Sequence, residues 1–259
     1  EYETDASNVF YVRIDKNRKL PVTVLCRALG LSSDEEILNF FGEDERILAT
    51  LEKDTTKNQD EGLLEVYRKL RPGEPPTVES ATNQINMLFF DPRRYDLSRF
   101  GRYKMNKKLS LARRITGFVA AENIVAPLTG EIIVEAKDKI TRELAEKADA
   151  AGVDTVILSI EGKKVKVITN GCVDAQGFFS FDVKECGINE RCSFDEIKKI
   201  LDTTSDVEEQ KEMLRRNHDQ LIGRTVTVKD ILSSINYLNG LGHGVGTTDD
   251  IDHLGNRRI

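Results

Sequence analysis

The 259-residue sequence contains no tryptophan, few histidines and cysteines, and no long run of apolar residues. A membrane-spanning helix needs about 20 consecutive apolar residues, and no apolar leader precedes Glu1, so we expect a cytoplasmic protein without membrane contact. The three histidines give no metal-ligand spacing. No CxxC pair of a structural zinc site occurs among the four cysteines, and reduced, inert thiols are expected at Cys26, Cys172, Cys186 and Cys192.

The composition is that of a soluble globular chain, with 39% hydrophobic and 32% charged residues. The length allows one large or two modest domains. The first residue is Glu1 rather than methionine, and the last ten residues form a charged phrase, so we expect both ends to be cut from a longer protein.

Positive charge is concentrated in one segment of this acidic chain. Residues 91–114 hold nine Lys and Arg against two Asp, a net charge of +7, whereas the whole chain carries −6. Such a run is usually a solvated face. Here, however, Tyr95, Phe100 and Tyr103 are interleaved with the cations, and aromatic rings stack on bases while cations meet phosphates. The segment therefore favours polyanion binding.

Periodicity and capping residues predict mixed helices and strands. In the first part we expect a strand over 9–14, helices over 21–30, 33–42, 62–70 and 77–89, and a short strand over Arg46–Leu51. Later in the chain we expect helices over 193–201, 206–216 and 227–238, and a strand-like segment over Gln220–Val226. The prolines of 71–76 predict a rigid corner between two helices.

The residue composition changes at about Thr116, after which β-branched residues are interrupted by glycines. Strands over 153–160 and 164–169 form an expected hairpin around Glu161-Gly162, and a helix is expected over 141–151. We interpret 116–187 as a smaller inserted β-rich subdomain. Residues 1–115 and 188–259 then form a helical or mixed main domain, and the fold class is α+β.

Several separated phrases carry a family resemblance. They are RPGEPPT (71–77), LFF (88–90), YDLS (95–98), GRYKMNKKL (101–109) and DIDHLGNRRI (250–259). In this order they resemble the lobe region of the bacterial RNA polymerase β subunit. The resemblance covers the chain from about Val12 onward and is weakest between 116 and 215.

The resemblance implies a role in transcription. As part of DNA-directed RNA polymerase, a nucleotidyltransferase, the lobe would form one wall of the DNA cleft and contact downstream duplex and the non-template strand. Its partners would be DNA, the β′, α and ω subunits and sigma factor. The fragment itself is expected to be a non-catalytic monomer without cofactor, because the family's Mg²⁺ is held by another subunit.

Two groups of DNA-binding residues are expected. Backbone contacts are assigned to Arg71, Arg94, Arg102 and Lys104. By resemblance, Ile251, Asp252 and Arg257 help to form a pocket for one unpaired non-template base, in which a carboxylate accepts from guanine. The alternative is that Asp252 and Arg257 only pair with each other.

Other functions have weaker support in the sequence. A free-standing single-stranded nucleic-acid-binding module would use the same basic segment. A small α/β enzyme would use the glycine-rich loop 240–248, but phosphate loops follow strands and open helices, whereas this loop follows a predicted helix. The aspartates at 249, 250 and 252 suit Mg²⁺ chemically, yet the family's catalytic aspartates belong to β′.

Overall fold

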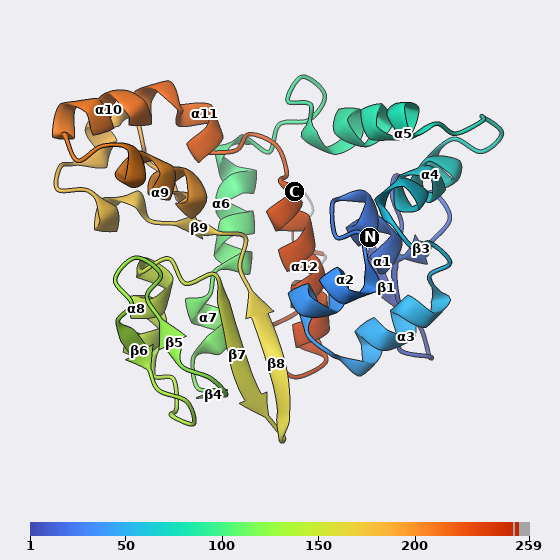
Figure 1. Ribbon diagram of the computed structural model, residues 1–259, viewed down its shortest axis with the longest axis horizontal. Coiled ribbons are helices and arrows are strands. Elements are labelled where there is room, and N and C mark those ends of the chain that lie inside the picture. Colours follow the sequence, from blue (N-terminus) through green and yellow to red (C-terminus); the bar gives the residue numbers. More distant parts are fainter. Residues whose placement is uncertain (251, 254–259) are drawn as a thin grey trace. The chain divides into compact units, whose positions relative to one another are not determined.

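The computed structural model describes residues 1–250, 252 and 253. Packing divides the chain into two compact units, Glu1–Tyr95 and the segment from Asp96 onward. Helices predominate in both, and the strands form small separate sheets (Figure 1). The predicted α+β class is confirmed.

The first unit begins with a three-stranded antiparallel sheet in the order β1-β2-β3 and continues as helices. The strands are β1 (Tyr2–Thr4), β2 (Phe10–Val12) and β3 (Leu20–Pro21). The helices are α1 (Val22–Ala28), α2 (Asp34–Phe41), α3 (Glu45–Lys53), α4 (Gln59–Leu70), α5 (Val78–Ile85) and the π-helical turn η1 (Asn86–Phe90).

Capping residues explain where these helices start. The Ser33 side chain accepts a hydrogen bond from the Glu36 amide, and the Glu36 carboxylate accepts from the Ser33 amide. This reciprocal capping box satisfies two amides that the helix leaves unpaired. Thr77 starts α5 in the same way with Ser80, so the predicted starts of these two helices and the proline-rich corner between α4 and α5 are confirmed.

The predicted strand over Arg46–Leu51 is wrong, because these residues belong to α3. The Asp44 side chain accepts from the Arg46 amide and caps the helix. Ile47 and Thr50, three residues apart, are the buried positions, which is helical spacing. The Thr50 hydroxyl also accepts from the Phe10 amide at 3.0 Å, so the helix is bonded to strand β2.

The second unit opens with the helices α6 (Ser98–Leu109) and α7 (Ala112–Ile115). Next come β4 (Val119–Ala120), β5 (Ile124–Val125), β6 (Ile132–Val134), α8 (Arg142–Ala150), β7 (Thr155–Ile160), β8 (Lys163–Ile168) and β9 (Cys172–Val173). The remainder is η2 (Ala175–Phe178), η3 (Val183–Cys186), β10 (Cys192–Ser193), α9 (Phe194–Thr203), α10 (Val207–Arg216), α11 (His218–Leu221) and α12 (Val228–Leu241).

The hairpin and helix predicted after residue 140 are confirmed. Strands β7 and β8 pair antiparallel around Glu161 and Gly162, whose φ angles of 51° and 78° are the left-handed values of a tight hairpin turn. Thr141 caps α8. In Figure 1, the hairpin lies beside α12, and Asn236 on α12 donates to the Lys166 carbonyl of β8 at 2.8 Å.

The predicted strand over Gln220–Val226 is wrong. The first residues of this segment belong to the short helix α11. The backbone carbonyls that follow are not paired in a sheet; they accept hydrogen bonds from α6 and from Leu97, the residue before α6. Leu97 donates to the Arg224 carbonyl at 2.8 Å, and Arg102 donates to the carbonyls of Gly223 and Thr225. A buried arginine, rather than a neighbouring strand, therefore satisfies this backbone.

The inserted subdomain over 116–187 stays a prediction. The two compact units divide at Tyr95 rather than at its proposed boundaries. Buried apolar residues of β4 to β8 and α8 pack in one cluster with Leu111, Ile115 and Val245, which lie outside the proposed insert. Part of its core is thus shared with flanking residues.

Candidate nucleic-acid interface

Helix α6 has two chemically different faces. At about 100° per residue, Phe100, Tyr103, Lys104 and Lys107 fall on one side of the helix. Phe100 and Tyr103 are 50% and 57% exposed. The opposite side carries Arg102, Asn106 and Leu109, all buried. An aromatic and cationic stripe therefore faces solvent; we call these four residues the α6 stripe.

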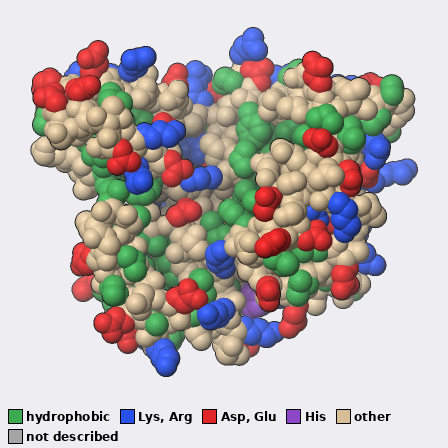
Figure 2. Space-filling model, viewed as in Figure 1, with side chains coloured by type: hydrophobic (Ala, Val, Ile, Leu, Met, Phe, Trp, Pro, Cys, Tyr) green, Lys and Arg blue, Asp and Glu red, His purple; other side chains and the backbone are tan. Residues whose placement is uncertain are grey.

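Lysines flank both exposed rings one helical turn further on. The Lys104 Nζ lies 5.7 Å from the centre of the Phe100 ring, and the Lys107 Nζ lies 5.7 Å from the centre of the Tyr103 ring. Within the described part of the chain, no carboxylate pairs with Lys104, Lys107 or Arg113 of α7. Their charge is therefore available to an anionic ligand. On the face shown in Figure 2, basic and acidic side chains are intermixed.

The buried face of α6 is anchored by an ion pair. Arg102 and Asp230 are 3% and 1% exposed, and Arg102 Nη1 donates to the two carboxylate oxygens at 2.9 and 3.1 Å. Arg102 Nε donates to the Gly223 carbonyl at 2.9 Å, and Nη2 donates to that of Thr225. The Arg102 guanidinium is hydrogen-bonded inside the fold, so Arg102 is not one of the cations that an external ligand can reach.

Asp230 also organises its surroundings. Its carboxylate accepts from the Thr227 amide at 2.9 Å and completes the capping box that starts α12. It accepts from the Asn170 side chain at 2.8 Å, and the same amide donates to the Asn106 side chain at 2.9 Å. Three segments distant in sequence thus meet at one carboxylate behind the α6 stripe.

A second buried arginine fixes α7. Arg114 donates to the Ile168 carbonyl at 2.6 Å and to the Asn236 side chain at 2.7 Å, and its guanidinium lies 5.1 Å from the centre of the Tyr237 ring. Burial lowers the pKa of Arg114 to about 10, so it remains charged at neutral pH. Since buried charges need partners, these contacts hold α7 against β8 and α12.

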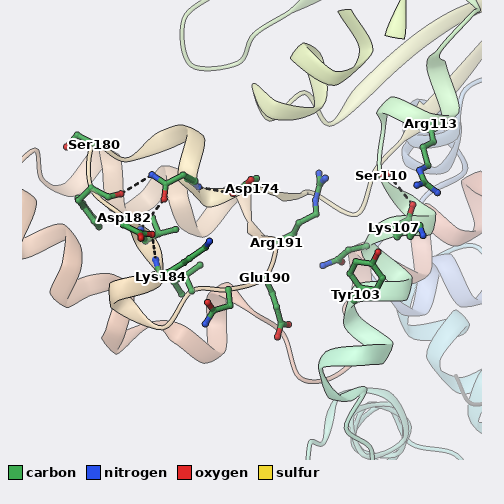
Figure 3. A pocket seen from close by; sticks show the side chains of 16 residues that line it. Tyr103, Lys107, Ser110, Arg113, Asp174, Ser180, Asp182, Lys184, Glu190 and Arg191 are labelled. Atoms are coloured by element: carbon green, nitrogen blue, oxygen red, sulfur yellow. Dashed lines mark hydrogen bonds between the residues drawn. The ribbon is translucent and has the colours of Figure 1, made fainter. Parts of the chain in front are cut away.

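A cavity of about 920 Å³ lies beside the stripe. Figure 3 shows Tyr103, Lys107 and Arg113 on one side of it and Asp182 and Lys184 on the other. A second hollow, of about 700 Å³, is lined by Lys104, Lys107 and Arg113 with residues of α12 and the loop that follows. The unpaired cations therefore border two depressions.

Other predicted backbone-contacting residues lie in the first unit. Arg71 ends α4, is exposed, and its amide donates to the Tyr67 carbonyl at 2.8 Å. The Tyr67 hydroxyl donates to Glu74 at 2.7 Å, which fixes the corner that carries Arg71. Arg94 is exposed too, and its amide donates to the Asp91 carbonyl. Lys104 belongs to the second unit, where it is half-buried.

The segment that leads to the predicted base pocket is tied to α6 and α12. Lys108 donates to Asp249 at 2.8 Å and to the Thr247 carbonyl at 2.6 Å, while the Tyr237 hydroxyl bonds both backbone groups of Thr247. Asp252 is exposed. Ile251 and Arg257 lie outside the described residues, and so does any pairing of Asp252 with Arg257.

Several residues that build the site were not identified from the sequence. Asp230, Asn170 and Asn236 look like ordinary polar residues in their segments, and only packing brings them to the buried arginines. The accessible cations Lys107 and Arg113 could have been separated from Arg102 and Arg114 by helical phase alone. Over residues 1–250, 252 and 253, no three His, Cys, Asp or Glu side chains gather as a metal site, and no helix is long and apolar enough to cross a membrane.

A helical α+β unit with a rigid, cationic and aromatic helix face is typical of proteins that contact polyanions. The family model described as "RNA polymerase Rpb2, domain 2" matches residues 1–125 and 163–259, and the chain belongs to this family. The unmatched residues 126–162 fall within the predicted insert.

Named relatives agree with this assignment. The chain is 57% identical to the DNA-directed RNA polymerase subunit beta of Acetivibrio thermocellus over 261 residues, and 53% identical to that of Clostridium beijerinckii over 259 residues. Both comparisons cover 100% of this chain and 21% of the relative. The chain thus spans about a fifth of the length of these relatives.

Proposed function

We propose that this chain acts as the lobe of an RNA polymerase β subunit, forming one wall of the DNA cleft and contacting downstream DNA and the non-template strand during transcription. Family membership supports the setting. The observation that carries the proposal is the unpaired positive charge of Lys104 and Lys107 on α6, a helix anchored by its opposite face, together with that of the exposed Arg113 on α7. Lysine and arginine side chains of this kind bind the phosphates of the DNA backbone.

In this proposal the backbone contacts come from cations of both units. Arg71, Arg94 and Lys104 remain from the sequence-based set, and Lys107 and Arg113 join them. Arg102 leaves the set, because its guanidinium is buried against Asp230. Such contacts position DNA without reading its sequence.

Base reading is proposed for the end of the chain, where Ile251, Asp252 and Arg257 would hold one unpaired non-template base. The exposed Asp252 carboxylate suits the N1 and N2 donors of guanine. Lys108 and Tyr237 support this role by fixing the backbone at Thr247, five residues before Asp252.

The catalytic chemistry is proposed to lie elsewhere in the assembled enzyme. Mg²⁺ would be held by another subunit, and this chain would contribute no catalytic residue to nucleotidyl transfer. The β′, α and ω subunits and sigma factor would be its protein partners, in the cytoplasm. Its own contribution is to orient DNA.

The salt dependence of DNA binding tests the proposal. In the assembled polymerase, the combined change Arg71→Gln, Arg94→Gln and Lys104→Gln should lower the log-log salt slope by about 2 to 3, because each lost phosphate contact removes about 0.7 to 0.9. Affinity should fall alike for all sequences. The control Lys199→Gln removes a lysine already paired with Glu196 at 2.6 Å and should leave the slope unchanged. An unchanged slope in the triple variant would refute the backbone contacts.

A further inference from the structure

We infer that Phe100 and Tyr103 stack on unpaired bases of single-stranded DNA, while Lys104 and Lys107 hold the adjoining phosphates. The inference deepens the proposed function and rests on it. It assigns a ligand chemistry, unpaired bases, to a helix face that would otherwise offer only charge.

The two rings are unusual for this chain. Of the large apolar side chains that are exposed in the described part, Tyr95, Phe100 and Tyr103 are the aromatic ones. Phe100 and Tyr103 are three positions apart on one helix, a spacing at which side chains are neighbours with Cβ atoms about 5–6 Å apart. Single exposed apolar residues need no explanation, but two neighbouring rings, each with a lysine one helical turn further on, form a defined surface.

The pairing of ring and lysine fits a nucleotide. A base presents a flat face that stacks on an aromatic ring with little regard to sequence, and its phosphate attracts a cation. Each ring of the stripe has an ammonium 5.7 Å from its centre. When a base stacks on the ring, the flexible lysine is able to move its ammonium group to the adjoining phosphate.

The ligand is unpaired because duplex bases are not accessible to the rings. In a duplex both faces of a base are covered by its neighbours, so stacking on a side chain requires a strand whose bases are splayed out. The cavity of about 920 Å³ beside Tyr103 provides room for such a base, with Lys184 on its far side; Arg191, which also lines the cavity, is already paired with Asp149 at 2.8 Å.

The stripe is also pre-organised. Arg102 and Asn106, on the opposite side of α6, bond Asp230 and Asn170 in the buried network. The helix therefore does not have to become ordered when a strand binds, and this lowers the cost of association. An apolar protein partner would gain nothing from three unpaired cations, whereas a nucleic-acid strand does.

The test uses abasic sites in the assembled polymerase. Single abasic nucleotides are placed in turn along the non-template strand of an open promoter complex, and complex lifetime is measured for the wild type and for Phe100→Ala/Tyr103→Ala. In the wild type, one or two abasic positions should shorten the lifetime by about 5- to 150-fold, the effect of about 1–3 kcal/mol per stacked base. In the double variant, the same abasic positions should have no further effect.

Two further variants separate stacking from structure. Phe100→Tyr/Tyr103→Phe retains both rings and should restore the wild-type pattern. Ile132→Ala removes an exposed apolar side chain from β6, 49% exposed, and should leave every lifetime unchanged. A 2-aminopurine base at the sensitive position should lose fluorescence on binding the wild type and keep it with the double alanine variant.

Each alternative has its own outcome. If the abasic penalties persist undiminished in Phe100→Ala/Tyr103→Ala, the stacking inference is overturned, while a reduced salt slope in Arg71→Gln/Arg94→Gln/Lys104→Gln would leave the proposed function standing. If the double variant instead weakens capture of sigma factor and spares DNA lifetimes, the rings contact protein and the inference is wrong. If the abasic penalties persist in the double alanine variant and the salt slope of the triple glutamine variant is also unchanged, the proposed function is refuted as well.

Discussion

Replacing Arg102 by methionine should destabilise the second unit far more than a surface charge change does. The side chain is 3% exposed and makes four hydrogen bonds, two to Asp230 and one each to the carbonyls of Gly223 and Thr225. Methionine fills similar space but leaves the Asp230 carboxylate buried without its cation. Breaking such a pair typically costs about 3–5 kcal/mol.

The remaining partners of Asp230 limit the loss. Its carboxylate keeps the Thr227 amide and the Asn170 side chain as donors, so we expect a value near the lower end, about 3 kcal/mol. For a unit of this size, about 2–4 °C per kcal/mol gives a fall in midpoint temperature of about 6–12 °C. Urea denaturation of the 259-residue chain, followed by circular dichroism, measures the free energy directly.

A second substitution separates charge burial from lost packing. Asp230→Asn keeps the shape of the side chain and removes the charge, so Arg102→Met/Asp230→Asn should be less destabilised than the sum of the single variants, by about 0.5–3 kcal/mol of coupling. Lys104→Met, on the exposed side of the same helix, should change stability by less than about 0.5 kcal/mol. A similarly small change for Arg102→Met would refute the anchoring role of the buried pair.

Three further predictions concern other parts of the chain. Asp252→Ala in the assembled polymerase should erase a preference for guanine at one non-template position, worth about 1–3 kcal/mol; equal complex lifetimes with all four bases in the wild type would end the pocket hypothesis. Burial raises the pKa of the Cys192 thiol to about 12 from its ordinary 9.0. Between pH 9 and 12 the folded chain therefore keeps this proton while the unfolded chain loses it, so the stability present below pH 9 is lost as pH rises toward 12. Over that range the free energy of unfolding should fall by up to about 1.4 kcal/mol per pH unit more steeply than in Cys192→Ala, and equal slopes would contradict the assignment. Lys108→Met should cost less than about 1 kcal/mol because the pair with Asp249 is partly exposed, yet it should speed amide hydrogen exchange at Thr247; unchanged exchange would show that the lysine does not hold this loop.

The sequence predicts the elements whose signals are local. Ser33, Thr77, Thr141 and Thr227 cap helices where their spacing indicates, since a cap depends on residues three positions away. The hairpin at Glu161-Gly162 follows from its turn chemistry for the same reason.

Predictions fail where distant residues decide the structure. The segment after Gln220 has strand-like composition, but Arg102, more than 100 positions earlier, donates hydrogen bonds to its carbonyls. The same buried contact removes Arg102 from the accessible cations. The nine positive charges of residues 91–114 indicate that this segment attracts anions. The phase of α6 separates the outward-facing cations from Arg102, and only the folded structure shows that Asp230 is its partner.

The central claim, that the exposed face of α6 lies on DNA, is tested most directly by a photocrosslink. With p-benzoylphenylalanine in place of Lys107 in the assembled polymerase, irradiation of an open promoter complex should join the chain to the non-template strand at a few adjacent nucleotides. The same residue in place of Lys199 should give no DNA adduct. Adducts of the Lys107 position with protein alone, in complexes that are competent for transcription, would contradict the claim.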